Sequence, residues 1–122
     1  MEMESILASV KKMLGIGSDY DHFDPEIIMH INSTFSDLHR LGVGPREGFL
    51  IEDDTSTWAD FMPDMPGVHS VKTYIFLKVK LLFDNSTLSS TVIAAMERQI
   101  KEYEWTLNAA CDFSREEETQ NE

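Results

Sequence analysis

The stretch that decides the fold is Val68–Phe83, which reads VHSVKTYIFLKVKLLF. More than half of its residues are apolar, and no other stretch of the chain is apolar on so many sides, so the core must form around it. Alternation over residues 75–82, with two lysines on one side, favours a half-buried strand. The same residues fit a helix that is buried over most of its circumference. The pattern alone does not separate these two interpretations.

Length and composition indicate one globular domain. The chain has 122 residues, 42% of them hydrophobic, which is enough to bury a core. No apolar run reaches the ~18 residues that a membrane span needs, and the first residues lack the apolar region of a signal peptide. The single cysteine, Cys111, excludes an intrachain disulfide. We therefore expect a domain made in the cytosol, without a membrane segment.

The formal net charge of −12 bears on the partners of the chain. Without a basic patch that could release counterions, the protein should be repelled by nucleic-acid phosphates. The charge can simply keep the protein soluble. It can also belong to a surface that faces DNA without gripping it, or that imitates DNA. The charge alone leaves these interpretations open.

Two helices are predicted in the first third of the chain. Apolar residues spaced by three and four predict a helix over residues 4–14, ended by Gly15, with Lys11 and Lys12 in its last turn. Asp24 and Pro25 then predict the N-cap and first turn of a second helix, which Gly42 ends. Its predicted buried face consists of Ile27, Ile28, Ile31, Phe35, Leu38 and Leu41.

Residues 43–67 are the irregular part of the chain, because glycines and prolines interrupt them repeatedly. Thr57 predicts the start of one short helical turn. The residues expected to anchor this loop to the core are Phe49, Ile51, Trp58 and Phe61. A loop of this length is unusual in a compact domain. It is either an interaction surface or a segment merely pinned by its aromatic residues, and both alternatives stay open.

The C-terminal part predicts the longest helix, over residues 88–112. Its apolar residues recur every three or four positions and predict a seam for near-antiparallel packing on another helix: Ile93, Met96, Ile100, Tyr103, Leu107 and Ala110. Glu97 and Lys101 are spaced for an ion pair on the outer face. Trp105 lies off the seam, where it either covers the edge of the core or meets a partner. Residues 114–122 form an acidic tail that we expect to be disordered.

No catalytic, cofactor or metal site is expected. The aspartates around His22 lack the glycine and the final acid of a calcium loop, and no nucleophile motif or paired Cys/His spacing is present. The residues therefore predict a mainly α-helical interaction protein and not an enzyme. Four long elements are expected, with the aromatic-anchored loop between the second and the third. The residues expected at a partner interface are Trp58, Phe61, Trp105 and Phe113.

The order of these segments resembles the small head–tail connector proteins of tailed bacteriophages, which are also called adaptor or head-completion proteins. The resemblance is carried by residues 21–32, residues 41–45, Trp58 with Phe61, residues 72–84 and residues 100–108. It spans most of residues 3–108. Such proteins often hold prolines after the position of Asp84, where this chain has Asn85 and Ser86.

The resemblance implies a helical bundle and so favours a helix for Val68–Phe83. We expect a single connector domain over residues 1–113, followed by the acidic tail over residues 114–122. It also implies a closed ring of about twelve copies, joined by heterologous contacts, beneath the portal protein. The ring would bind a stopper or tail-completion protein, and DNA would pass through it without specific binding. The expected location is the head–tail interface of the virion, after assembly in the host cytoplasm.

Two other functions remain as alternatives. An acidic DNA-mimic inhibitor, or another protein-binding module, would account for the net charge. A small enzyme is disfavoured by the missing catalytic set.

Overall fold

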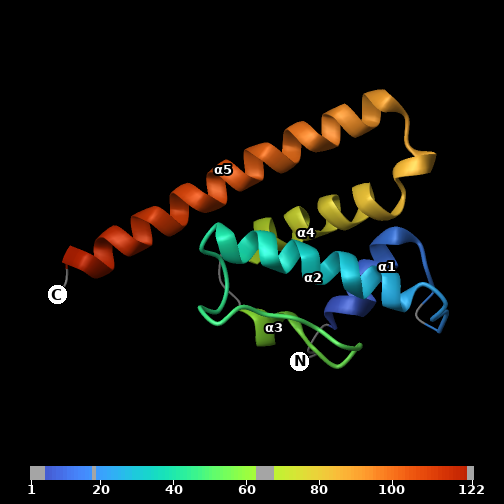
Figure 1. Cartoon of the computed structure of the whole chain (residues 1–122), viewed down its shortest axis with the longest axis horizontal. Helices are drawn as coiled ribbons and strands as arrows, with labels where there is room; N and C mark the ends of the chain where they lie inside the picture. Colours follow the sequence, from blue (N-terminus) through green and yellow to red (C-terminus); the bar gives the residue numbers. More distant parts are fainter. Residues whose placement is uncertain (1–4, 18, 63–67, 121–122) are drawn as a thin grey trace.

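The computed structural model describes residues 5–17, 19–62 and 68–120, with side chains as far as residue 109. Within these residues the chain forms five α-helices and one 3₁₀ turn, with no strand beyond an isolated pairing of Ser5 with Thr57. The elements are α1 (Ile6–Leu14), α2 (Asp24–Arg40), α3 (Trp58–Phe61), α4 (Val68–Phe83), η1 (Asn85–Thr87) and α5 (Ser90–Gln120). The prediction of a small, mainly helical bundle is confirmed (Figure 1).

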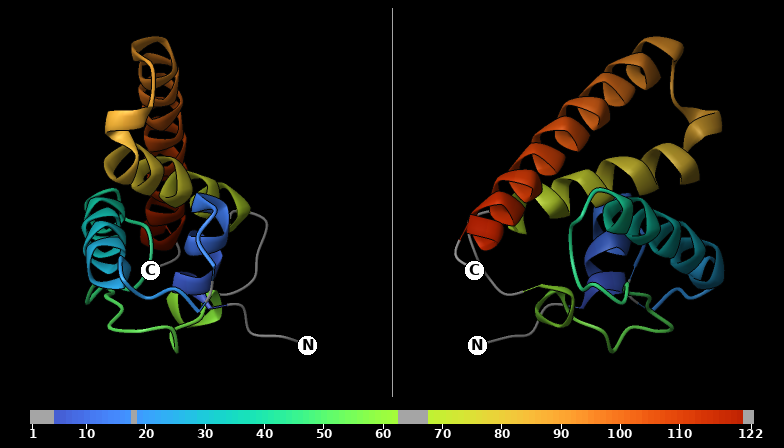
Figure 2. Two further views of the ribbon diagram at one scale, coloured as in Figure 1. Left: turned by 90° about the vertical axis from the view of Figure 1, so that its right-hand side faces the viewer. Right: turned by 60° about the vertical axis from the view of Figure 1, so that its left-hand side comes forward.

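Helix α4 lies at the centre of the bundle. It packs against α2 and α1 on one side and against α5 on the other (Figures 1 and 2). The buried residues of α4 are Val71, Tyr74, Ile75 and Val79, and Phe76, Leu77, Leu81 and Phe83 are partly buried against the core. The neighbouring helices cover α4 from several directions, which explains why its sequence is apolar on so many sides. The structure also decides the open question between strand and helix, because Val68–Phe83 forms an α-helix.

Helix α2 presents one face to the core, as its 3–4 spacing predicts. Its buried residues are Ile27, Ile31, Thr34, Phe35 and Leu38. The hydroxyl of Thr34 donates to the carbonyl of His30 at 2.9 Å, so this polar side chain is satisfied inside the core. The helix ends at Arg40, and Gly42 follows with a φ of 88°.

The predicted cap at the start of α2 is wrong. Phe23, one residue earlier, occupies the N-cap position without a side-chain cap, and its ring packs edge-on against Phe83 with centroids 5.3 Å apart. Asp24 is the first helical residue. Its carboxylate lies 2.9 Å from the ammonium of Lys11, at the end of α1. The charge on Asp24 therefore joins two helices instead of capping one.

This ion pair is unusual because the lysine is buried. The side chain of Lys11 is 3% exposed and that of Asp24 is 24% exposed, whereas the neighbouring Lys12 is exposed. Burying a charge is costly unless it is paired. The contact therefore fixes where α1 lies relative to the start of α2.

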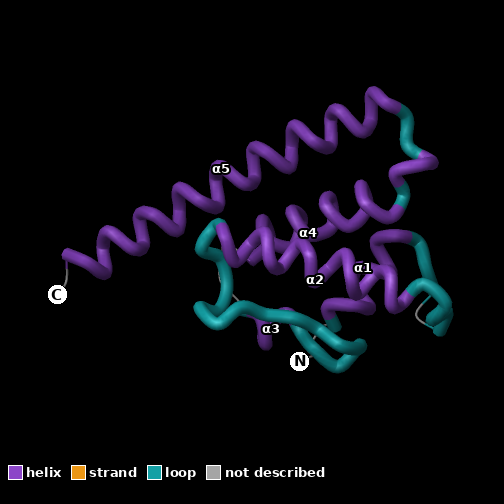
Figure 3. Tube along the Cα trace, viewed as in Figure 1, coloured by secondary structure: helices purple, strands orange, loops and turns teal. Residues whose placement is uncertain are grey.

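The loop from residue 41 to residue 57 crosses the face of the bundle opposite α5 (Figure 3). Two hydrogen bonds hold it to α2: the amide of Asn32 donates to the carbonyl of Ile51 at 3.0 Å, and the N–H of Ile51 donates to Asn32 Oδ1 at 2.8 Å. A cluster of Phe35, Phe49 and Phe61 lies beside them, with centroids 4.6–5.3 Å apart. The loop is thus anchored by its aromatic residues, as predicted.

Helix α3 is the predicted short turn, and it also fixes α1. Thr57 and Asp60 form a reciprocal capping box at its start. The indole N–H of Trp58 donates to Ser9 Oγ at 3.1 Å, and the N–H of Ile6 donates to the carbonyl of Ser56 at 3.0 Å. The two segments are far apart in sequence but lie side by side.

Helix α5 packs on α4 through the predicted seam. Met96, Ile100 and Leu107 are buried, and Tyr103 is partly buried. Ala110 lies beyond the described side chains. The helix continues to Gln120, past the predicted boundary between domain and tail at residue 114, and its C-terminal part extends beyond the ends of α2 and α4 (Figure 1). The predicted ion pair between Glu97 and Lys101 is not formed among the described residues.

Replacing Lys11 with alanine should lower the free energy of unfolding by about 3 kcal/mol, because the partly buried side chain of Asp24 would lose this partner. Lys12→Ala is the matched control and should change it by less than about 0.5 kcal/mol, because Lys12 is exposed. Urea unfolding of the two variants measures both values. Equal effects would mean that the Lys11–Asp24 pair does not hold α1 in place.

Two glycines offer a second matched comparison. Gly44 has a φ of +93°, and a Cβ placed on it would lie 2.6 Å from Cε1 of the buried Phe61. Gly15 has a φ of +81°, with open space around its Cβ position. Gly15→Ala should therefore cost about 1–2 kcal/mol from backbone strain alone. Gly44→Ala should cost about 1–3 kcal/mol more, because the aromatic cluster must move, and thermal unfolding would show the difference.

Candidate functional site

The described residues contain no constellation that indicates catalysis. Among them, no group of three or more His, Cys, Asp or Glu side chains is placed to hold a metal ion. In the same part of the chain, no helix has the length and hydrophobicity to cross a membrane.

Four residues were predicted at a partner interface, and the structure places them differently. Trp58 is 4% exposed and Phe61 is 3% exposed, so both side chains belong to the core of the subunit. Trp105 is 75% exposed on α5. Phe113 lies further along α5, outside the described side chains. Trp105 is consequently the described member of this set that a partner can reach without rearrangement.

Trp105 projects from the face of α5 opposite the packed seam. Polar contacts hold that helix in position: the hydroxyl of Tyr74 on α4 donates to Glu104 Oε2 at 2.8 Å, and the amide of Asn108 donates to the carbonyl of Leu41 at 3.4 Å. Tyr74 is completely buried. Burial raises the pKa of Tyr74, and the neighbouring Glu104 carboxylate raises it further.

A second polar contact joins α4 to α2. The ammonium of Lys78 lies 3.0 Å from a carboxylate oxygen of Asp37, which also pairs with Arg40. The lysine lies 5.9 Å from the centre of the Tyr74 ring, within reach of a cation–π interaction. Helices α2, α4 and α5 are thus connected by charges as well as by apolar packing, so the outer face of α5 is presented in a defined orientation.

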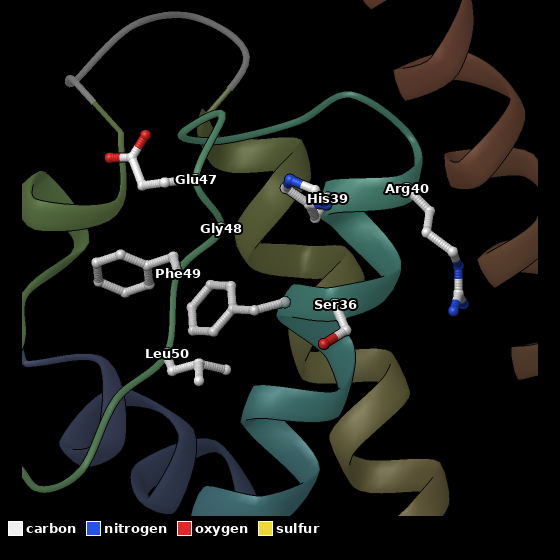
Figure 4. A pocket seen from close by; sticks show the side chains of 8 residues that line it. Ser36, His39, Arg40, Glu47, Gly48, Phe49 and Leu50 are labelled. Carbon is white, nitrogen blue, oxygen red and sulfur yellow. The ribbon is translucent and has the colours of Figure 1, made fainter.

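A hollow of about 550 Å³ opens between α2 and the loop (Figure 4). Phe35 and Phe49 supply aromatic surface inside it. Ser36 and His39 line it from α2, and Glu47 and Leu50 line it from the loop. One wall is fixed by His39, whose Nε2 lies 2.8 Å from the carbonyl of Arg46. Leu50 at the rim is 66% exposed.

The loop beside this hollow is strongly acidic. Its exposed acids are Glu47, Glu52, Asp53 and Asp54, and Arg46 is the basic residue among its described positions. The hydroxyl and the N–H of Thr55 donate to Asp53 and lower the pKa of its carboxyl. This side of the molecule therefore carries negative charge at neutral pH.

The sequence did not reveal the hollow, because its two walls come from segments that fold back on each other. The sequence also did not indicate that Leu50 is exposed, because other apolar residues of the same loop anchor it to the core. The position of Trp105 off the seam was a usable signal, and it correctly indicated that this residue differs from the core residues of α5.

The fold and these surfaces define a small helical protein whose exposed features suit contacts with other macromolecules. A comparison with protein families gives a more specific result: the model for "Phage connector protein" matches residues 6–114. The match covers all the helices of the described bundle up to most of α5, and the chain therefore belongs to this family of structural phage proteins. Comparisons with curated proteins and with solved structures found no match.

Replacing Tyr74 with phenylalanine should lower the free energy of unfolding by about 1–2 kcal/mol near pH 7, because the hydrogen bond to Glu104 is lost while the ring is kept. The difference from wild type should shrink above about pH 10. There the unfolded wild-type chain releases its tyrosine proton, whereas the folded chain keeps it, so folding of the wild type weakens as the pH rises. Urea unfolding from pH 7 to pH 11.5 measures this difference.

Tyr20→Phe serves as the control, because Tyr20 is half-exposed and should change the unfolding free energy by less than about 0.5 kcal/mol. A Tyr74→Phe effect that stays constant up to pH 11.5 would contradict the assignment of a raised pKa to Tyr74.

Proposed function

We propose that this connector protein assembles into a closed ring at the head–tail junction, where it joins the portal protein to a stopper or tail-completion protein. Membership of the phage connector family over residues 6–114 carries this proposal. The mature location is the virion, and the subunits assemble in the host cytoplasm. The work of such a protein is to hold other proteins in register, which requires surfaces and not a reactive centre.

The shape of the subunit supports a ring. The outer face of α5 and the acidic loop lie on opposite sides of the layer formed by α2 and α4 (Figures 1 and 2). Contacts between two different surfaces of identical subunits are heterologous, and they close into a ring when the rotation between neighbours permits. The part of α5 that extends beyond the bundle offers a further surface to the portal protein or to a neighbouring subunit.

The net charge of −12 supports a channel for DNA. Phosphates are repelled by an acidic lumen, and a wall without basic patches does not displace the counterions that are condensed on DNA. DNA would pass such a wall without being held. In this proposal, exposed acids outside the contacts between subunits contribute to the lumen.

Mixing the purified chain with the portal protein of the same phage tests the proposal. We expect a complex on size-exclusion chromatography with light scattering, and a second ring stacked on the portal in electron micrographs. The chain alone is analysed in parallel, which shows whether the ring forms before or after recruitment. A chain that stays monomeric and never binds portal or virions would overturn the proposal.

The acidic DNA-mimic inhibitor has only the net charge in its favour, and a gel-shift assay separates it from the connector. A connector should neither retard DNA nor release DNA from nucleic-acid-binding enzymes at micromolar concentration. A mimic would compete with DNA for such an enzyme. Bovine serum albumin, another acidic protein, is a suitable control for unspecific charge effects.

A further inference from the structure

The strongest unassigned feature of the surface is Trp105. Its side chain is 75% exposed, although tryptophan is the residue with the largest apolar area to bury. Lys101 and Arg98 lie four and seven positions before it and therefore share its face of α5. Both are exposed, and neither forms an ion pair within the part of the chain that the structure describes. Among the described side chains, the acid Glu102 shares this face, and Glu97 lies four positions before Lys101. The patch of Arg98, Lys101 and Trp105 is called the α5 patch below.

The hollow between α2 and the loop has the complementary properties. Its volume of about 550 Å³ is ample for an indole ring, and Phe35 and Phe49 offer aromatic surface to such a ring. Exposed Leu50 at the rim would lose its contact with water. Glu47 lines the hollow, and Glu52, Asp53 and Asp54 follow it along the loop. Arg40, which pairs with Asp37, lines the hollow from α2. The acids thus flank the aromatic hollow on the side of the loop, while cations accompany the exposed tryptophan.

These two surfaces cannot meet within one subunit. Helix α5 and the loop lie on opposite sides of the α2–α4 layer in every view (Figures 1 and 2). Contact is possible only between two copies, and it leaves a free hollow on one copy and a free α5 patch on the other. The arrangement therefore propagates from subunit to subunit, as a ring requires.

We propose that Trp105 of one copy inserts into the hollow of the next copy, with Arg98 and Lys101 against the acidic residues of its loop. This inference rests on the proposed ring and names the contact that joins neighbouring subunits. The tryptophan is the anchor of the contact, and the charges select the orientation and exclude pairing of two α5 patches. The α5 patch and the hollow are different surfaces of the same subunit, so the contact has a direction around the ring.

Two single substitutions test the contact. Trp105→Ala removes the anchor, and Leu50→Arg places a cation at the rim of the hollow. Each variant should assemble about 30-fold more weakly, as expected for loss of a central tryptophan, in reactions with and without portal. Both residues are exposed, so both variants should unfold at the same urea concentration as the wild type.

Mixing the two variants gives the sharper result. Trp105→Ala keeps an intact hollow, and Leu50→Arg keeps an intact α5 patch, so one good contact can form between them. We expect mixed dimers in sedimentation analysis and no longer assemblies, whereas each variant alone stays monomeric. A contact in which the two surfaces do not meet would give no mixed dimers, and that outcome would overturn the inference.

The fluorescence of the two tryptophans provides an independent measurement. Trp58 is buried in the free subunit, so a blue shift on assembly must come from Trp105. The shift should be present in Trp58→Phe and absent in Trp105→Phe, which keeps an aromatic anchor for assembly. If Trp58→Phe assembles without a blue shift, Trp105 is not at the interface.

Failure of this inference is distinguishable from failure of the proposed function. A wild-type chain that neither self-assembles nor binds portal would remove the ring itself. Rings that form equally well from wild type and Trp105→Ala would keep the proposed function and reject the contact. A cross-linking experiment adds a positive result, since Trp105→Cys with Leu50→Cys, on a Cys111→Ser background, should yield disulfide-linked ladders of subunits.

Discussion

The structure depends on one constraint, which is that a helix apolar on most of its sides must be covered on most of its sides. Helix α4 meets this constraint with α1 and α2 on one side and α5 on the other. No single neighbour could bury Val71, Ile75 and Val79 together with the partly buried residues around them. The other helices are amphipathic because each of them buries only one face against the core. Several of them are needed because α4 is apolar on several sides.

Apolar cover alone would allow the helices to slide, and the polar contacts remove that freedom. Lys78 pairs with Asp37 on α2, and Tyr74 donates to Glu104 on α5, so two neighbouring turns of α4 select positions on two different helices. Lys11 does the same between α1 and the start of α2. Each of these groups would be costly to bury without its partner. They specify one arrangement among the many that would bury similar apolar area.

Periodicity predicted much of this fold, because the core faces of α1, α2 and α5 are continuous in sequence. The 3–4 spacing of Ile27, Ile31 and Leu38 is enough to identify a buried face, and all three side chains lie in the core. The same argument failed for α4, because the alternation over residues 75–82 fits a strand as well, and only the family resemblance favoured a helix there. Asp24 was taken for a cap because its partner, Lys11, is distant along the chain. Trp58 and Phe61 were expected at an interface, but local sequence does not show whether an aromatic residue turns inward. The hollow combines residues of α2 with residues of the loop, so no sequence window contains it.

The attachment of the loop has a consequence for how such a protein can diverge. Asn32 holds the loop through the main-chain N–H and carbonyl of Ile51, and these groups are present whichever amino acid stands at that position. The fold therefore places few demands on the neighbouring exposed side chains, such as Leu50 and Glu52. A phage lineage could exchange them to match a changed neighbour in the particle while the scaffold beneath keeps its shape. The main-chain hydrogen bonds of Ile51 and the exchangeable side chains beside it are adjacent in the chain. The binding preference can therefore change in evolution while the fold is kept.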